Sequence, residues 1–270
     1  MQEQLHQRIL SRIHRQYQIV TERVTLGPLS FDFTRIADPD QVLDQVADEE
    51  DRRQKASGNR LTEDELHLPY WAQLWDSAFG IGKFLLDHAS PHSAPPTTPP
   101  SPASRWPAGP VSSPTPTDSP APQLTLANVL DLGCGMGFAG TVAAALGARV
   151  LFADLETPAL LFAALNSLPW RSRVRTRRTN WRTDDLGEQF NLIIGADILY
   201  ERAQWPYLEP FWRKHLAPGG TVLLGEPGRQ TGDLFIDWIA QRPWIFRRYE
   251  QPVPTRPQPI RIFQLTLPVS

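Results

Sequence analysis

The sequence predicts a doubly wound α/β fold: a mostly parallel seven-stranded sheet with helices on both faces, preceded by a small N-terminal α+β extension. Short apolar runs alternate with helix-forming segments from residue 128 onward, which is typical of a parallel sheet. The first run ends in closely spaced glycines, as a nucleotide-binding turn between a strand and a helix does. The last two runs have no helix between them, so they must pair antiparallel as a hairpin.

Residues 1–87 are expected to form an extension that packs on the core. The extension is predicted to hold a helix, a β-hairpin and an acidic helix, over 3–16, 17–24 with 29–36, and 38–52. A further helix is expected after Asp76 and Ser77, either of which can cap it. From 88 to 124 the chain is rich in proline, serine, threonine and alanine. Because such a segment buries too little apolar surface to fold, it predicts a disordered insertion.

The core is expected over residues 125–270. Its strands are predicted at 128–132, 149–155, 174–179, 190–196, 221–225, 244–249 and 259–267. Its helices are predicted at 138–146, 158–166, 203–215 and 232–241, the third of them stopped by Pro218-Gly219-Gly220.

The turn after the first core strand allows two interpretations. Gly135 to Gly140 match G-x-G-x-x-G, the dinucleotide fingerprint, and Asp154 follows about 20 residues on, as that fingerprint requires. Alternatively, Asp131 opens the pattern D-x-G-x-G-x-G, in which a carboxylate can face the ammonium group of a ligand. This second pattern resembles the first motif of class I S-adenosylmethionine (AdoMet) methyltransferases. The closing hairpin, which is usual in that class and not in NAD-binding sheets, favours AdoMet.

Three further positions point to the same cofactor. Asp154 ends the second strand, where its carboxylate could accept both ribose hydroxyls or instead cap the next helix. Trp181, after the third strand, could stack on adenine or simply pack in the core. Trp71 and Trp75 could wall a pocket and attract a sulfonium through its positive charge, or serve as core residues where the extension docks.

The acceptor is expected at the ends of the fourth and fifth strands. Asp197 and Tyr200, in A-D-I-L-Y, could orient an incoming amine, although Asp197 could also cap a helix. Glu226, in E-P-G-R, could face the substrate, and Arg229 could pair with it or with Asp197. The alternative for E-P-G-R is a turn with a structural ion pair.

Arginines alternate along the third core strand, at positions 171, 173, 175 and 177, and 178 and 182 lie nearby. On a strand the first four would share one face. Charged edge strands discourage aggregation, which is the favoured interpretation, and a dock for nucleic acid or an acidic protein is the alternative.

Composition excludes several classes of function. The net charge of −2 gives no overall polycation for nucleic acid or membrane. Cys134 is the only cysteine, and the six histidines show no metal-site spacing, so neither a disulfide framework nor a metal is expected. No signal-peptide or membrane-spanning stretch is present in the sequence. A cytoplasmic monomer that does not bind membranes is therefore expected.

These motifs together resemble the seven-strand methyltransferases of family 16, and most closely the electron transfer flavoprotein β-subunit lysine methyltransferases and their bacterial relatives. The motifs are P-Y-W-A-Q-L-W-D-S-A, D-L-G-C-G-M-G, A-D-L, A-D-I-L-Y and E-P-G-R, and the resemblance covers about residues 69–87 and 127–245. Two features depart from it: the Pro-rich insertion, and E-P-G-R where relatives often have D-P-G-R.

The resemblance implies a Rossmann-like fold and a role for each matched residue. The implied cofactor residues are Trp75, Asp131, Gly133, Gly135, Asp154, Trp181 and Ala196, and the implied acceptor residues are Asp197, Tyr200 and Glu226. The function expected is AdoMet-dependent methyl transfer to a protein lysine, by direct in-line displacement onto a deprotonated amine. The alternatives are transfer to a small molecule or RNA, and a non-catalytic AdoMet-binding interaction module.

Overall fold

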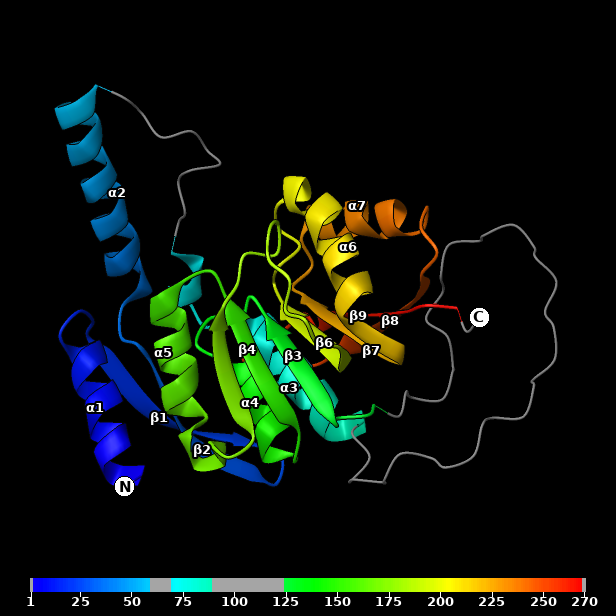
Figure 1. Ribbon diagram of the computed structural model, residues 1–270, viewed down its shortest axis with the longest axis horizontal. Helices are drawn as coiled ribbons and strands as arrows, with labels where there is room; N and C mark the ends of the chain where they lie inside the picture. The colour runs from blue at the N-terminus through cyan, green and yellow to red at the C-terminus, as the bar shows by residue number, and fades with distance from the viewer. Residues whose placement is uncertain (1, 59–68, 89–123, 269–270) are drawn as a thin grey trace.

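A seven-stranded sheet forms the centre of the computed structural model, which describes residues 2–58, 69–88 and 124–268 (Figure 1). The strand order is β5-β4-β3-β6-β7-β9-β8. The strands are β3 (Asn128–Leu132), β4 (Arg149–Asp154), β5 (Val174–Arg178), β6 (Phe190–Ala196), β7 (Leu216–Glu226), β8 (Ile245–Gln251) and β9 (Ile260–Thr266).

Strands β5, β4, β3, β6 and β7 are parallel, and β9 lies antiparallel between β7 and β8. The predicted fold class, with its closing hairpin, is confirmed. The carboxyl ends of the parallel strands therefore meet at one edge, where such sheets bind ligands.

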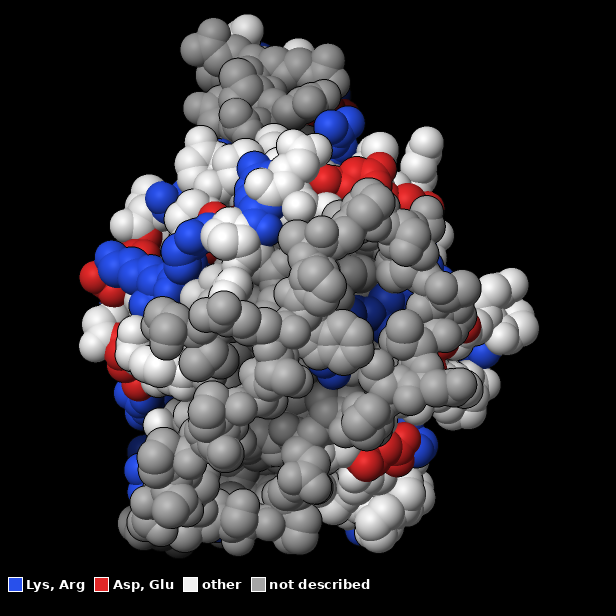
Figure 2. All heavy atoms as spheres, turned by 90° about the vertical axis from the view of Figure 1, so that its right-hand side faces the viewer, with Lys and Arg blue, Asp and Glu red and all other residues white. Residues whose placement is uncertain are grey.

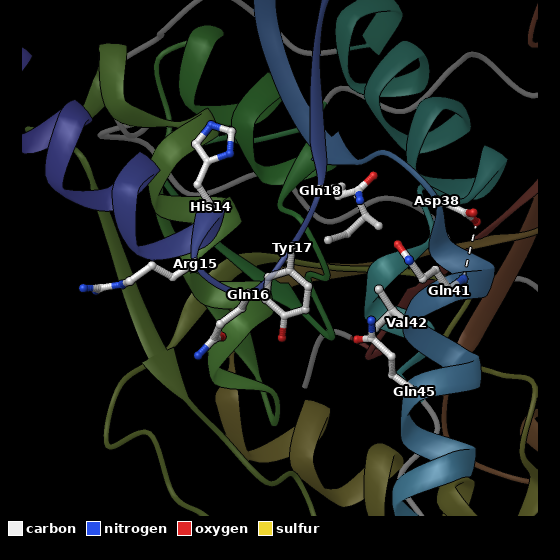
Figure 3. A pocket seen from close by; sticks show the side chains of 10 residues that line it. His14, Arg15, Gln16, Tyr17, Gln18, Asp38, Gln41, Val42 and Gln45 are labelled. Carbon is white, nitrogen blue, oxygen red and sulfur yellow. Dashed lines mark hydrogen bonds between the residues drawn. The ribbon is translucent and has the colours of Figure 1, made fainter.

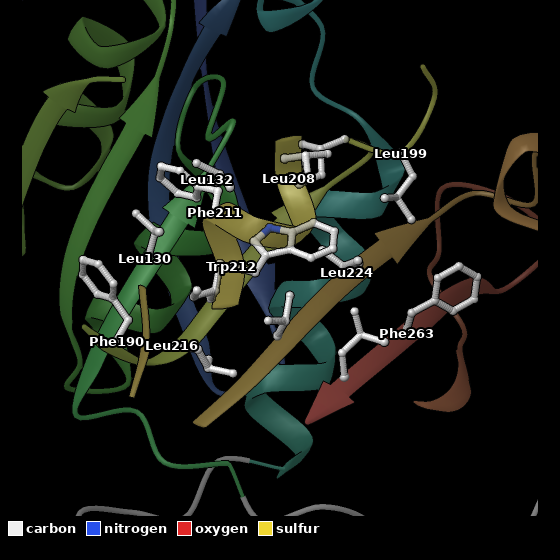
Figure 4. Packing of buried hydrophobic residues seen from close by; sticks show 14 of the residues in the cluster. Leu130, Leu132, Phe190, Leu199, Leu208, Phe211, Trp212, Leu216, Leu224 and Phe263 are labelled. Carbon is white, nitrogen blue, oxygen red and sulfur yellow. The ribbon is translucent and has the colours of Figure 1, made fainter. Parts of the chain in front are cut away.

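Helices cover both faces of the sheet. One face is packed by α6 (Trp205–His215) and α7 (Gln230–Ile239), which contribute aromatic side chains to the core. Phe211 and Trp212 of α6 lie among buried side chains of the sheet in Figure 4. The other face is packed by α3 (Asp76–His88), α4 (Phe138–Ala145) and α5 (Thr157–Asn166). Three short 3-10 turns, at Tyr70–Ala72, Leu168–Trp170 and Arg202–Gln204, complete the connections.

The N-terminal elements are α1 (Gln2–His14), the predicted hairpin β1 (Ile19–Leu26) with β2 (Leu29–Ile36), and α2 (Pro39–Ser57). The hairpin packs against α5, and buried Asn166 joins it to the glycine turn. The Asn166 side chain accepts from Thr34 N at 2.7 Å and donates to Thr34 O and Met136 O, both at 3.0 Å. The extension is thus fastened directly behind the ligand-binding edge.

Two details differ from the sequence-based expectations. Strand β7 begins at Leu216, directly after α6, so Pro218-Gly219-Gly220 lies within the strand and does not separate the two elements. The strand is irregular there: Gly219 has φ +70°, and the pairing register between β6 and β7 shifts between Phe190 and Leu192. Helix α3, which was assigned to the extension, packs on β7 and β9 of the core sheet. The division at residues 87 and 125 stays a prediction, and most of the expected insertion (89–123) lies outside the described residues.

Candidate cofactor and acceptor site

The glycine turn follows β3 and leads into α4. Gly133, Gly135 and Gly137 all have positive φ, at 62°, 51° and 81°. A Cβ on Gly137 would lie 2.7 Å from the Ala163 Cβ, so the turn can approach α5 only with glycine here. Near Gly135 the closest atom to an added Cβ is the Trp71 carbonyl oxygen at 3.5 Å, so this glycine is required by its conformation alone. The backbone N–H groups of Gly133 and Cys134 both donate to Ala153 O of β4, at 2.8 and 3.2 Å, so the turn is held against that strand.

Asp131, on β3, is 2% exposed, and its Oδ2 accepts from Gly140 N at 2.8 Å. Asp131 therefore accepts a hydrogen bond from a backbone N–H in the first turn of α4. A Cβ on Gly140 would lie only 2.6 Å from the Asp131 Oδ2, so a side chain at this position would disturb the contact. Burial raises the pKa of Asp131 to about 8, and the nearby Asp154 carboxylate adds to the rise. The sequence did not predict this contact with the helix.

Asp154, at the end of β4, holds the same turn from the other side. Its Oδ2 accepts from Gly135 N and its Oδ1 from Glu156 N, both at 2.9 Å. Burial raises the pKa of Asp154 to about 6 in spite of these hydrogen bonds, which lower it. Asp154 is not the N-cap residue of α5, which is Glu156, but its carboxylate accepts from the backbone N–H of that residue at the start of the helix.

Asp131 and Asp154 are thus two buried carboxyl groups at the same turn, and the Asp154 carboxylate raises the pKa of Asp131. Within the described ranges neither has an ion pair with a basic side chain. Buried carboxylates are ordinarily paired because an uncompensated charge in the interior is costly. The turn therefore suits a ligand that brings positive charge.

The two tryptophans before α3 have different surroundings. Trp71 is buried and lies edge-on to Tyr17, with ring centroids 5.4 Å apart, and against Phe162 at 5.9 Å. It is a core residue where the extension docks. Trp75 is half-buried at the sheet edge, donates its indole N–H to Tyr70 O at 3.0 Å, and lies under the Arg229 guanidinium at 5.4 Å. Only Trp75 is therefore placed to wall a pocket.

Trp181 is half-buried beyond β5 and packs against the edge of the core. Its ring lies 3.6 Å from the position of a Cβ on Gly133, and its indole N–H donates to Gln204 at 3.0 Å. Trp181 therefore lies beside the glycine turn, and the hydrogen bond to Gln204 holds its ring in place.

The acceptor side begins where β6 ends. Half-buried Ala196 is the last residue of β6, and Asp197 follows with φ +55°, the sole positive φ outside glycine among the described residues. Asp197 N donates to Gly225 O at 2.9 Å, and the carboxylate receives a fork from Arg229, with Nε to Oδ1 at 3.1 Å and Nη2 to Oδ2 at 2.9 Å. Of the two expected pairings of Arg229, this is the one that forms through its side chain.

Glu226 does not face the edge as a free carboxylate. It is 1% exposed and forms a buried ion pair with Arg261 of β9, while its oxygens also accept from the backbone N–H groups of Gly228 and Arg229. Arg261 further binds Asp233 of α7. The geometry therefore agrees with the alternative interpretation of E-P-G-R, a turn with a structural ion pair. In this role Glu226 holds the loop that carries Arg229.

Tyr200 is 43% exposed and completes the rim with Tyr70, the two ring centroids lying 5.3 Å apart. Partial burial raises the pKa of the Tyr200 hydroxyl to about 12, with further increases from Glu201 and Tyr70. The hydroxyl is therefore protonated at neutral pH and can donate a hydrogen bond. Tyr70 also lies edge-on to Trp75 at 6.4 Å, so Tyr70 joins Trp75 and Tyr200 into one group of aromatic rings.

A model of the lysine methyltransferase family matches residues 57–241, more than half of the chain. The chain belongs to the lysine methyltransferase family. The match spans the glycine turn, Asp154, Asp197 and the Glu226 loop, and it confirms the resemblance to family 16.

Two curated relatives carry the name protein N-lysine methyltransferase METTL21A. The Danio rerio protein is 39% identical over 104 residues, which are 36% of this chain and 47% of the relative. The Xenopus tropicalis protein is 36% identical over 104 residues, with the same shares. This family member thus spans about half the length of the curated relatives it matches.

Among solved structures, the glycopeptide N-methyltransferase MtfA in complex with S-adenosyl-L-methionine is similar to 54% of this chain and 83% of its own, with 15% identity and a TM-score of 0.48.

The arginines of β5 are engaged within this family member. β5 is an edge strand, as expected. Arg175 pairs with Glu188, Arg177 donates to the carbonyls of Leu186 and Asp185, and Arg178 donates to Leu155 O. These bonds support the interpretation as a charged edge. Among the described atoms that are visible in Figure 2, basic and acidic side chains lie beside one another.

Two hollows are lined by residues that do not belong to the glycine turn. One, of about 250 Å³, is lined by residues that follow β4 and β5, among them Leu155, Asn180 and Asp184. The other, of about 220 Å³, lies between the end of α1 and the start of α2, where Tyr17, Gln41 and Gln45 border it (Figure 3). In the described part of the chain no group of three His, Cys, Asp or Glu could hold a metal ion, and no helix is long and apolar enough to cross a bilayer.

Sequence reasoning missed three contributors to the site: Tyr70, Gln204 and Arg261. Tyr70 stands within the quoted Trp motif, so its position beside Trp75 was an available signal. Arg261 lies on β9, far along the chain from Glu226, and only the insertion of β9 beside β7 brings the two together. No local pattern indicates such a partner.

Proposed function

We propose that this member of the lysine methyltransferase family is an AdoMet-dependent protein-lysine methyltransferase that transfers the methyl group directly to a deprotonated amine. The observation that carries the proposal is the pair of buried carboxyl groups, Asp131 and Asp154, that hold the glycine turn through Gly140 N and Gly135 N. A cationic amino-acid ligand would find carboxyl groups without a basic partner at this edge.

The residues present fit AdoMet. Asp131, Gly133 and Gly135 would hold its amino-acid end, Asp154 its ribose and Trp181 its adenine, while Trp75 and Ala196 would border the transferable group. The support is chemical: uncompensated carboxylates match an ammonium and a sulfonium, and an indole face attracts a sulfonium. When bound, AdoMet supplies an electrophilic methyl group.

The acceptor residues would orient a lysine. Asp197 and Tyr200 offer a carboxylate and a hydroxyl donor at the rim, and Glu226 contributes by holding the Arg229 loop. A lysine amine has a pKa of about 10.4 and must lose its proton to react. Catalysis would then come chiefly from holding the amine nitrogen in near-attack geometry. The names of the curated relatives support a protein lysine as the acceptor, and we propose a monomer acting in the cytoplasm.

The test is to incubate the purified protein with methyl-labelled AdoMet and an extract of its own host, with separate protease and nuclease treatments. We expect label in one or a few proteins, lost with protease and retained with nuclease, and recovered as methyl-lysine after acid hydrolysis. Label lost with nuclease would move the acceptor to RNA, and no label in any component would support the non-catalytic AdoMet-binding alternative.

Replacing Asp154 with alanine is expected to weaken AdoMet binding at least about tenfold, because hydrogen bonds to a charged group contribute about 1.5–3 kcal/mol. Titration calorimetry measures the affinity. Asp185→Ala is the matched control, since Asp185 is an exposed carboxylate that pairs with Lys214 on the surface. An affinity for AdoMet equal in the two variants contradicts the ribose assignment.

A further inference from the structure

Arg229 lies where the cation of an acceptor would be expected. Its guanidinium makes two hydrogen bonds to the Asp197 carboxylate, at 3.1 and 2.9 Å, and sits 5.4 Å from the centre of the Trp75 ring. A carboxylate on one side and an indole face on the other are the two groups that recognise a positively charged side chain. Both are already engaged by a cation of the chain itself.

The position of Arg229 is imposed by its backbone. Its N–H donates to Glu226, and its carbonyl accepts from Arg261 Nη2 at 2.7 Å. Glu226 and Arg261 are an ion pair buried at 1% and 8% exposure, so the loop is clamped from both sides. The Arg229 side chain is 41% exposed, whereas the Asp197 side chain is only 4% exposed. The carboxylate is therefore covered by the guanidinium.

We propose that Arg229 is a positioning residue that neutralises Asp197, so that the site takes up the acceptor lysine as an uncharged amine. The inference rests on lysine methyl transfer as the proposed function and deepens it. Without Arg229, the buried Asp197 carboxylate would hold an ammonium, whose nitrogen has no free lone pair to form a bond to carbon. With Arg229 in place, the proton leaves to solvent, and the amine nitrogen remains free to react.

Other charged and titratable groups lie around the pair and around its neighbour Tyr200, on each neighbouring element. They are Glu226 at the end of β7, Arg261 of β9, Asp233 of α7, Glu201 after β6, Asp154 of β4, Tyr70 and Tyr200. Glu226, Arg261 and Asp233 form their own ion pairs, and the tyrosines are uncharged at neutral pH. Glu201 and Asp154 are near Tyr200, and among the described residues the basic side chain that pairs with Asp197 is Arg229, which therefore supplies the positive charge beside that carboxylate.

The test uses Arg229→Gln, which removes the charge, Arg229→Lys, which keeps it, and Arg175→Gln, which breaks the surface pair with Glu188 as a control. The probe is the acceptor protein identified by labelling, at saturating AdoMet. An unpaired carboxylate raises the pKa of a neighbouring lysine amine by about one unit or more, because it favours the charged form. For Arg229→Gln we expect the rise of kcat with pH to move about one pH unit higher, giving about tenfold lower kcat near neutrality, together with an unchanged or lower KM for the acceptor.

We also expect the kcat of Arg229→Gln to recover at high pH. The dependence of kcat on pH should be unshifted in Arg229→Lys and in Arg175→Gln. If Arg229→Gln lowers kcat equally at every pH, the residue is only structural and the proposal is wrong. A higher KM with an unchanged kcat profile also contradicts it. Absence of transfer by the unaltered protein at every pH is a different result, which overturns the proposed function and this proposal with it.

Discussion

Replacing Asp197 with glycine is expected to reduce methyl transfer by about a thousandfold or more while AdoMet binding changes little. The carboxylate faces Arg229 and the aromatic rim, not Asp131 or Asp154, so its loss should disturb acceptor positioning and spare the cofactor residues. Losing near-attack geometry can remove that much rate. Single-turnover transfer rates and calorimetric AdoMet titration measure the two effects separately.

Glycine is the preferred replacement because Asp197 has φ +55°. Alanine in that conformation is strained by about 1–2 kcal/mol, whereas glycine adopts it without strain and asparagine at little cost. Asp197→Ala should therefore be as inactive as Asp197→Gly and less stable, and the difference between their unfolding free energies reports the strain. If Asp197→Gly keeps most of the activity, the carboxylate has no role in transfer.

Replacing Asp131 with asparagine is expected to stabilise the ligand-free protein and to weaken AdoMet binding. The pKa of Asp131 is raised by burial from 3.8 to about 8. Between these values the folded protein retains a proton that the unfolded chain has lost, so this group's contribution to stability falls as pH rises from about 4 to about 8. Asparagine keeps an oxygen to accept from Gly140 N and removes the charge.

The gain at pH 8 should be on the order of 1 to 3 kcal/mol, and it should shrink toward pH 5. Chemical denaturation of both proteins at several pH values measures it, and Asp185→Asn serves as an exposed control. Equal stability at every pH would show that Asp131 ionises without cost in the folded state. Unchanged AdoMet affinity would show that the cofactor does not use its charge.

The sequence predicted the sheet, its closing hairpin and most element boundaries, because strand and helix periodicity are local properties. It also placed Asp131, Asp154 and Asp197 at one edge, since the carboxyl ends of parallel strands must meet there. It could not separate Trp71 from Trp75, because four residues of spacing do not say which ring contacts Tyr17 and Phe162 of distant elements.

Glu226 shows the same limit more clearly. Its position after β7 correctly indicated the sheet edge, but its direction depends on Arg261, which lies 35 residues later on a strand that inserts beside β7. A buried carboxylate and an approachable one have the same local sequence. Only the pairing of strands decides between them.

The placement of β9 between β7 and β8 has a consequence for how the chain matures during synthesis. The ribosome delivers the glycine turn, Asp154 and Asp197 well before residue 260, so the cofactor edge can begin to assemble on the nascent chain. The bonds from Arg261 to Glu226 and to the Arg229 carbonyl can form only later, because Arg261 lies on β9, which follows the other strands of the sheet in the chain. A prematurely terminated chain that stops before β9 would thus carry the cofactor residues without an ordered acceptor loop, and would leave the β7 edge open to pairing with other chains.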